Sequence, residues 1–121
     1  MNGRANPWHV EQVDASVVER LDGLHAPYPG AVDAGVDIMG DPHRETDDGY
    51  NWTVLSRARR VADVVPGSAA VMGSGIGTYL AKVVAWDFEA SDDDPMVVLD
   101  LVPLTPQAIE RALQRNRTTA A

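Results

Sequence analysis

The chain has 121 residues, a formal net charge of −8 and no cysteine. Its length is typical of one domain with one core, and we expect a single domain over residues 1–121, with a loosely ordered arm at 1–13 and a frayed tail at 118–121. The absence of cysteine excludes disulfides, thiolate metal sites and thiol catalysis. The excess negative charge repels a phosphate backbone, so we expect no nucleic-acid partner.

The N-terminal residues lack the apolar run of a secretory signal peptide, and no stretch of the sequence has enough apolar residues to span a bilayer. We therefore expect a cytoplasmic protein without a membrane partner. Small acidic domains dock readily on basic protein surfaces. We accordingly expect a protein partner with a basic surface. The sequence leaves open whether the chain also forms a homodimer.

The first predicted element is a short helix that begins at Ser16 and stops near Gly23. Ser16 and Glu19 have the spacing of a capping box, and glycine is common at helix ends. The apolar stripe of this helix consists of Val17, Val18, Leu21 and Leu24.

Residues 26–49 are rich in Pro, Gly and Asp, and we expect a long ordered loop there with one short strand around residues 34–39. Long loops in compact domains often carry function. Four polar residues in this loop lie two positions apart, so their side chains would point to the same side if the chain were extended. These candidate binding residues are Asp41, His43, Glu45 and Asp47. They contain oxygen and imidazole ligands for a divalent ion, but we predict no metal because a structural zinc site needs four fixed ligands.

Residues 50–56 and 96–104 have the composition of strands. In the second of these, Val97, Leu99 and Leu101 share one face. Pro66-Gly67 predicts a turn that leads into a strand at 68–72. Thr105, followed by Pro106, predicts the start of a C-terminal helix.

Residues 78–89 fit two interpretations. The apolar face of a helix would consist of Leu80, Val83, Val84 and Phe88. One face of a strand would consist of Leu80, Val84, Trp86 and Phe88. The abundance of β-forming residues, such as Tyr79 and Trp86, favours the strand.

If residues 78–89 are helical, Gly73, Gly75 and Gly77 lie between a strand and a helix N-terminus, where backbone amides hold phosphate. Asp100 then follows on the next strand, where an acidic group can bind a ribose. In this order, about the last 50 residues resemble the cofactor-binding start of class I methyltransferases. The resemblance implies nucleotide or S-adenosylmethionine binding at these four residues. The chain departs from the family because Asp100 lies mid-strand and the strand before the glycines lacks an acidic residue.

We prefer the strand interpretation. The stretch from Gly73 to Gly77 is then a hairpin loop in which glycine supplies positive φ. Residues 68–72, 76–89 and 96–102 form a meander, which residues 50–56 extend. Such strands curl in a small domain. We therefore predict an α+β fold, namely a small antiparallel β-meander or SH3-like barrel with an N-terminal and a C-terminal helix.

We recognise no complete catalytic set in the sequence. We therefore expect a small acidic, non-enzymatic binding or accessory module that docks on a protein partner, such as an immunity- or antitoxin-type inhibitor, and needs no cofactor. Its acidic loops at 41–48 and 91–94 would face the partner. Trp52 and Trp86 are further binding candidates. The alternative is a compact barrel enzyme or small-molecule binder with an aromatic-lined pocket.

Overall fold

The computed structural model describes residues 13–102 together with Gln107, Glu110 and Gln114, which are helical. Most of the predicted C-terminal helix, including Thr105, lies outside the described residues, as do the tail at 118–121 and nearly all of the arm at 1–13. The described elements are α1 (Ala15–Leu24), α2 (Pro29–Ala34), β1 (Ile38–Met39), β2 (Asn51–Val54), the 3-10 helices η1 (Leu55–Arg57) and η2 (Val61–Val64), β3 (Ala69–Ser74), β4 (Gly77–Asp87) and β5 (Met96–Val102).

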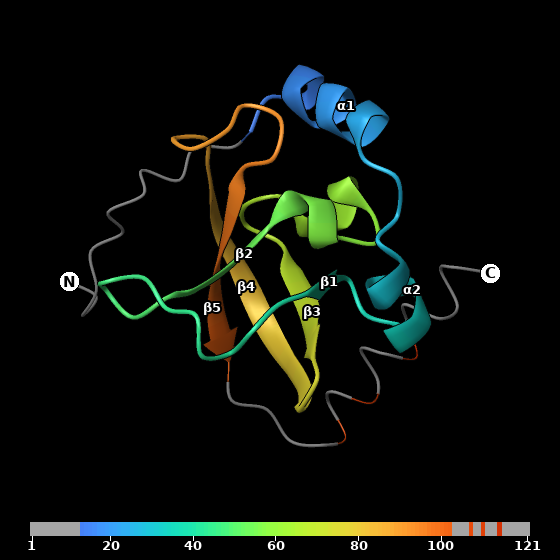
Figure 1. Ribbon diagram of the computed structural model, residues 1–121, viewed down its shortest axis with the longest axis vertical. Coiled ribbons are helices and arrows are strands. Elements are labelled where there is room, and N and C mark those ends of the chain that lie inside the picture. The colour runs from blue at the N-terminus through green and yellow to red at the C-terminus, as the bar shows by residue number, and fades with distance from the viewer. Residues whose placement is uncertain (1–12, 103–106, 108–109, 111–113, 115–121) are drawn as a thin grey trace.

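The strands form one five-stranded mixed sheet in the order β1-β3-β4-β5-β2, which curls into a half-barrel (Figure 1). Strands β3, β4 and β5 form an antiparallel meander, and β2 lies antiparallel to β5. This confirms the predicted meander and the strand interpretation of residues 78–89. The predicted extension by residues 50–56 is confirmed for residues 51–54, whereas Leu55 and Ser56 belong to η1. Strand β1, which lies parallel to β3, was not predicted as part of this sheet. The chain is thus an α+β protein with a barrel-like sheet.

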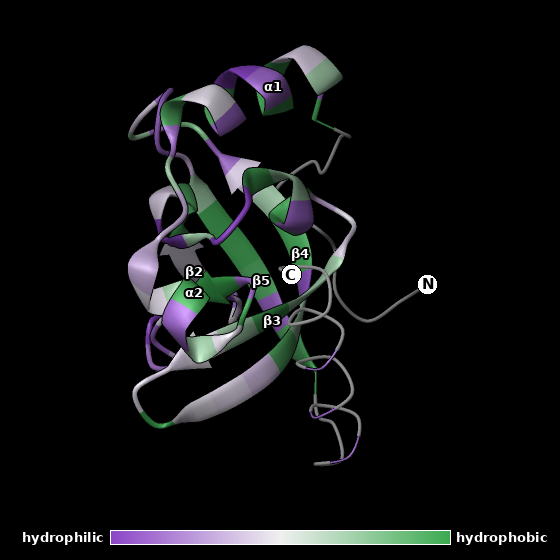
Figure 2. Cartoon of the chain, turned by 90° about the vertical axis from the view of Figure 1, so that its right-hand side faces the viewer, coloured by the Kyte–Doolittle hydropathy of each residue, from purple (hydrophilic) through white to green (hydrophobic). Residues whose placement is uncertain are grey.

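The main core joins one face of the sheet to α1, η1 and η2. Its buried members include Leu21, Leu55, Val61, Val64, Met72, Val83, Trp86, Val97 and Leu99. Figure 2 shows the hydrophobic residues concentrated on the strands, with hydrophilic residues in the outer loops. Val97, Leu99 and Leu101 all contact this core, as expected from their shared face.

A β-bulge in β4 breaks the predicted alternation of that strand. The register with β5 shifts between Val83 and Ala85. A bulge inserts one extra residue and moves the following side chains to the opposite face. Val83 and Trp86 therefore both contact the main core, whereas Val84 packs in a separate cluster. The predicted single face of Leu80, Val84, Trp86 and Phe88 is wrong for this reason.

Helix α1 begins before the predicted cap. Asp14 is its N-cap, and the Asp14 carbonyl accepts hydrogen bonds from the N–H groups of Val17 and Val18. Ser16 therefore lies inside the helix. Leu24, which was expected on the buried stripe, is 55% exposed.

The predicted loop at 26–49 contains a helix that was not expected from the sequence. Helix α2 begins with Pro29 at its first position and ends at Ala34, and its C-cap Gly35 has a φ of 68°. Proline at the start and glycine after the end are ordinary helix-boundary signals. The expected strand at 34–39 is reduced to the two residues of β1, because Ala34 completes the helix.

Asp37, which precedes β1, joins three segments at one buried point. Its backbone N–H donates to the Val71 carbonyl at 2.9 Å, and its carboxylate accepts the Val71 N–H at 2.7 Å. Its carbonyl accepts the Arg59 N–H at 2.8 Å, and the Arg59 guanidinium lies 3.9 Å from its carboxylate. Asp37 is 1% exposed and Arg59 is 7% exposed. Burial of the Asp37 carboxylate is tolerated because it accepts a hydrogen bond and lies close to the Arg59 guanidinium.

The two edge strands of the half-barrel, β1 and β2, approach each other along a seam. Ile38 forms an isolated antiparallel bridge with Ala58, which follows η1. The Thr53 hydroxyl of β2 donates to the Met39 carbonyl of β1 at 2.8 Å. Local contacts of this kind, in place of a continuous ladder, close the seam and leave room for a surface hollow beside it.

Gly23 and Gly67 form a matched pair for testing the backbone geometry, because a Cβ added at either one meets no heavy atom within 4 Å. Gly23 lies in α1, whereas Gly67 has a φ of 93° in the predicted Pro66-Gly67 turn. We expect Gly23→Ala to raise the free energy of unfolding by about 0.5–1 kcal/mol, since alanine favours a helix. Gly67→Ala should lower it by about 1 kcal/mol, since positive φ is costly for an L-residue.

Urea unfolding of the two variants and the wild type measures both changes. A Gly67→Ala variant as stable as the wild type would contradict the geometry of this turn.

Candidate functional site

A hollow of about 250 Å³ lies at the seam between β1 and β2, and we call it the seam hollow. It is lined by Gly40, Asp41, Arg44, Trp52, Thr53, Val54 and Arg57. A second hollow of about 290 Å³, the hairpin hollow, is lined by Gly40, Asp41, Pro42, His43, Ser74, Gly75 and Ile76. Gly40 and Asp41 line both hollows and therefore form a ridge between them.

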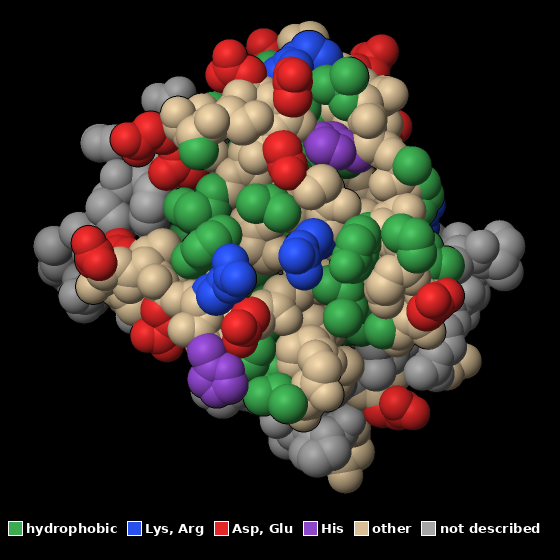
Figure 3. All heavy atoms as spheres, viewed as in Figure 1, with side chains coloured by type: hydrophobic (Ala, Val, Ile, Leu, Met, Phe, Trp, Pro, Cys, Tyr) green, Lys and Arg blue, Asp and Glu red, His purple; other side chains and the backbone are tan. Residues whose placement is uncertain are grey.

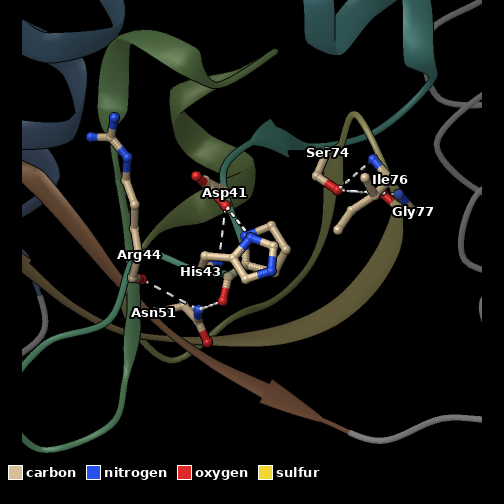
Figure 4. A network of polar contacts seen from close by, with 8 residues as sticks. Asp41, His43, Arg44, Asn51, Ser74, Ile76 and Gly77 are labelled. Atoms are coloured by element: carbon tan, nitrogen blue, oxygen red, sulfur yellow. Dashed lines mark hydrogen bonds and ion pairs between the residues drawn. The ribbon is translucent and has the colours of Figure 1, made fainter.

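Hydrogen bonds from β2 fasten the chain that forms the wall of the seam hollow. The amide side chain of buried Asn51 donates to the carbonyls of Pro42 at 2.7 Å and Arg44 at 3.3 Å (Figure 4). The Trp52 N–H donates to the same Arg44 carbonyl at 3.2 Å. These contacts hold the 41–44 turn against β2 and place Arg44 beside Trp52.

Gly40 allows the close approach of β1, β2 and β3 at the base of the hollow. A Cβ at this position would lie 2.8 Å from the Met72 sulfur and 3.4 Å from the Thr53 Cβ. The Gly40 N–H also donates to the Gly73 carbonyl at 2.9 Å. A larger residue at position 40 would therefore require either the Met72 side chain or the ridge to shift.

Two arginines give the seam hollow a basic character that contrasts with the net charge of the chain. The Arg44 guanidinium lies over the Trp52 ring, 5.2 Å from its centroid, and that of Arg57 lies 5.7 Å from the centroid of the Tyr28 ring. Among the described residues, no carboxylate lies within ion-pair distance of either guanidinium. Figure 3 shows basic side chains near the middle of this face, bordered by hydrophobic ones.

Asp41 and His43 are the two candidate residues of the 41–48 loop that the structure brings into contact. The Asp41 carboxylate accepts the His43 backbone N–H at 2.9 Å, and the His43 ring nitrogen Nδ1 lies 3.2 Å from the same oxygen. The loop is not extended, because turns occur at residues 42–43 and 47–48. The assumption that parity points all four candidates the same way therefore fails.

Glu45 and Asp47 do not line either hollow. Glu45 forms an isolated backbone bridge with Asn51, and Asp47 is exposed in a turn. Within the described part of the chain, no cluster of three or more His, Asp or Glu residues could hold a metal ion.

The two tryptophans named as binding candidates occupy different environments. Trp52 is half-buried and lines the seam hollow. Trp86 lies in the main core, where its indole N–H donates to the Val64 carbonyl at 2.9 Å and its ring meets Phe88 edge-on at 6.3 Å. Trp86 thus packs as a core residue, and it lines neither of the two hollows.

The Gly73–Gly77 stretch joins β3 to β4 as an antiparallel hairpin, so it does not precede a helix. Of the glycines in the described residues, Gly35, Gly49 and Gly67 have positive φ, and those of the hairpin do not. The expected role of positive φ here is wrong. Asp100 pairs with Lys82 in mid-sheet, five residues and roughly 16 Å along β4 from the hairpin. The arrangement implied by the resemblance to class I methyltransferases is absent from these described strands.

The acidic loop at 91–94 is fastened to neighbouring elements. The Asp93 carboxylate accepts a hydrogen bond from Arg20 at 3.0 Å, and Asp94 accepts the N–H and hydroxyl of Ser56, both at 2.8 Å. In Figure 1 this loop lies at the top beside α1, whereas the 41–48 loop lies lower on the molecule. The two acidic loops therefore do not form one surface.

Asp41, His43 and Trp52 were among the predicted site residues, whereas Arg44, Arg57 and Gly40 were not. In the sequence, Arg44 lies within the acidic loop at 41–48, and Arg57 lies next to Arg59 and Arg60. A glycine directly after a short strand can signal close approach of a second backbone or side chain. This signal could have identified Gly40.

No protein-family model matches the chain, and neither a curated protein nor a solved structure shows significant similarity to it. In the described residues, none of the helices is both long enough and apolar enough to cross a bilayer.

The pKa of Asp41 lies below its ordinary value of 3.8, chiefly because the His43 backbone N–H donates to the carboxylate. The His43 ring and the Arg44 charge lower it further. Because the folded-state pKa is depressed, the stabilisation is present above pH 3.8 and is lost as the pH falls through the folded-state value. We expect His43→Ala to keep most of the lowering, because the backbone N–H remains.

Carboxyl-carbon NMR titration of Asp41 in the wild type and in His43→Ala checks this expectation. A return of the Asp41 pKa to 3.8 in His43→Ala would show that the imidazole, and not the backbone, controls the carboxylate.

Proposed function

We propose that the chain is a small, non-enzymatic binding module that docks on a protein partner through the seam hollow and the adjoining 41–48 loop. The single observation that carries the proposal is the seam hollow itself, which combines a half-buried Trp52 with the charged residues Asp41, Arg44 and Arg57. Hot spots of protein interfaces are enriched in Trp and Arg, which supports this assignment.

The polar groups of the two hollows support binding more than catalysis. The Thr53 hydroxyl donates to a backbone carbonyl, and the Ser74 hydroxyl oxygen accepts N–H groups of Ile76 and Gly77 within the hairpin. The His43 ring is paired with Asp41. Each of these hydroxyls therefore has a structural role that competes with nucleophilic chemistry.

The partner proposed here has a basic docking face. The net charge of −8 would steer such a face toward the chain, and the exposed carboxylates of Glu45 and Asp47 would meet it beside the hollow. An inhibitor of the immunity or antitoxin kind fits this description. The meander of β3, β4 and β5 with β2 is the part of the sheet that supports an SH3-like assignment, and β1 is an addition to it.

The test uses proteins encoded beside the gene as candidate partners and measures affinity by calorimetry. We expect Trp52→Ala to weaken binding by about tenfold or more, as is typical of an interface hot spot. The double variant Glu45→Gln/Asp47→Asn should weaken binding and reduce its salt dependence.

The matched control is Asp22→Asn/Glu89→Gln, which changes the net charge equally at exposed positions in α1 and after β4. It should leave the affinity within about twofold, because the altered charges lie outside the proposed surface. Equal weakening by both double variants would show that only overall charge matters, and an unaffected Trp52→Ala would place the interface elsewhere.

A further inference from the structure

The arginines of the seam hollow define the chemistry of the group that enters it. A guanidinium held over an aromatic ring by cation–π attraction still has its N–H groups available for an acceptor. Arg44 and Arg57 are both in this state, and both are exposed. Although the chain has a net charge of −8, such a pair attracts an anionic group to this hollow.

The size of the hollow limits what can enter. Its volume of about 250 Å³ is below the range of roughly 300–1,000 Å³ that is usual for drug-sized ligands and cofactors. A single side chain or a molecule of similar size fits this space. Trp52, Val54 and Gly40 provide the less polar part of the wall, against which the stem of such a group can pack.

Asp41 leaves the hollow with a single net positive charge. Its carboxylate lines the hollow beside Arg44 and Arg57 and is ionised at neutral pH. One negative charge on an entering group therefore balances the charged side chains of the hollow. A planar, monoanionic carboxylate also matches the fork of an arginine side chain.

We propose that the seam hollow binds a carboxylate group of side-chain size, held by Arg44 and Arg57 and packed against Trp52. The inference rests on the proposed function, because it specifies the group that a partner would insert into the same hollow. The carboxylate can belong to an acidic side chain of the partner or to a small free acid.

The experiment follows the Trp52 indole and arginine Nε–H signals of the full chain by ¹⁵N NMR. One arm adds sodium propionate, and sodium chloride at equal ionic strength is its control. A second arm adds the blocked peptide acetyl-Gly-Glu-Gly-amide, with acetyl-Gly-Gln-Gly-amide as its control. We expect saturable shifts with the carboxylate probes and not with their controls. Saturation by the peptide alone assigns the group to a side chain, and saturation by propionate alone assigns it to a free acid.

Arg44→Gln and Arg57→Gln should each weaken carboxylate binding by about fivefold or more, since a charge-assisted pair is lost. Arg60→Gln is the matched control, because Arg60 is exposed on the same stretch but pairs with Asp63 at 3.2 Å. Amide spectra confirm that the variants are folded.

The proposal is overturned by shifts that match those of chloride, by inorganic phosphate binding as tightly as propionate, or by wild-type binding in Arg44→Gln and Arg57→Gln. If the wild-type chain binds propionate but docks on no protein partner, the proposed function is refuted and the carboxylate site is retained. If it docks on a partner but binds no carboxylate, the carboxylate site is refuted and the proposed function is retained.

Discussion

The contact on which the rest of the structure depends is the buried junction at Asp37. Its backbone and carboxylate hold Val71 of β3, and its carbonyl and charge hold Arg59, which follows η1. Distant parts of the chain thus meet at one side chain that is almost completely shielded from water. In such surroundings an unsatisfied carboxylate is very costly, so the junction specifies one arrangement of these segments.

The position of the candidate site follows from this junction. Asp37 leads directly into β1, and the two residues of that strand lead to Gly40 and Asp41. On the other side, Arg59 follows η1 and so fixes where Arg57 and Ala58 lie. The seam therefore has both walls tied to the same buried pair, and the hollow exists because β1 and β2 approach each other without forming a ladder.

The distribution of charge also depends on this arrangement. Arg59 forms ion pairs with Asp37 and Asp63, and Arg60 forms an ion pair with Asp63. Arg57 and Arg44 contact aromatic rings and keep their charge at the surface. An acidic chain thereby presents a small basic hollow beside an acidic loop.

The sequence predicted what depends on local signals and missed what depends on distant contacts. The meander was predictable because Tyr79 and Trp86 favour strands and Pro66-Gly67 marks a turn. The bulge at Val84 left no local signal, and it decided which residues of β4 contact the core. Arg57, Arg59 and Arg60 form one basic cluster in the sequence, and only tertiary contacts separate the buried arginine from the one at the hollow. For the same reason, Asp41 and Trp52 were identifiable as candidate residues, but the hollow that they line together with Arg44 was not predictable.

Amide hydrogen exchange in Asp37→Ala tests the role of the junction most directly, with Asp22→Ala on α1 as the control. We expect exchange to accelerate by about tenfold or more at Val71, Gly40 and Arg59, relative to Val98 in the middle of β5, because the junction loosens before the meander does. Asp22→Ala should leave this pattern unchanged. A uniform acceleration across the sheet, or no acceleration at these three amides, would contradict the conclusion that Asp37 holds the two walls of the seam in place.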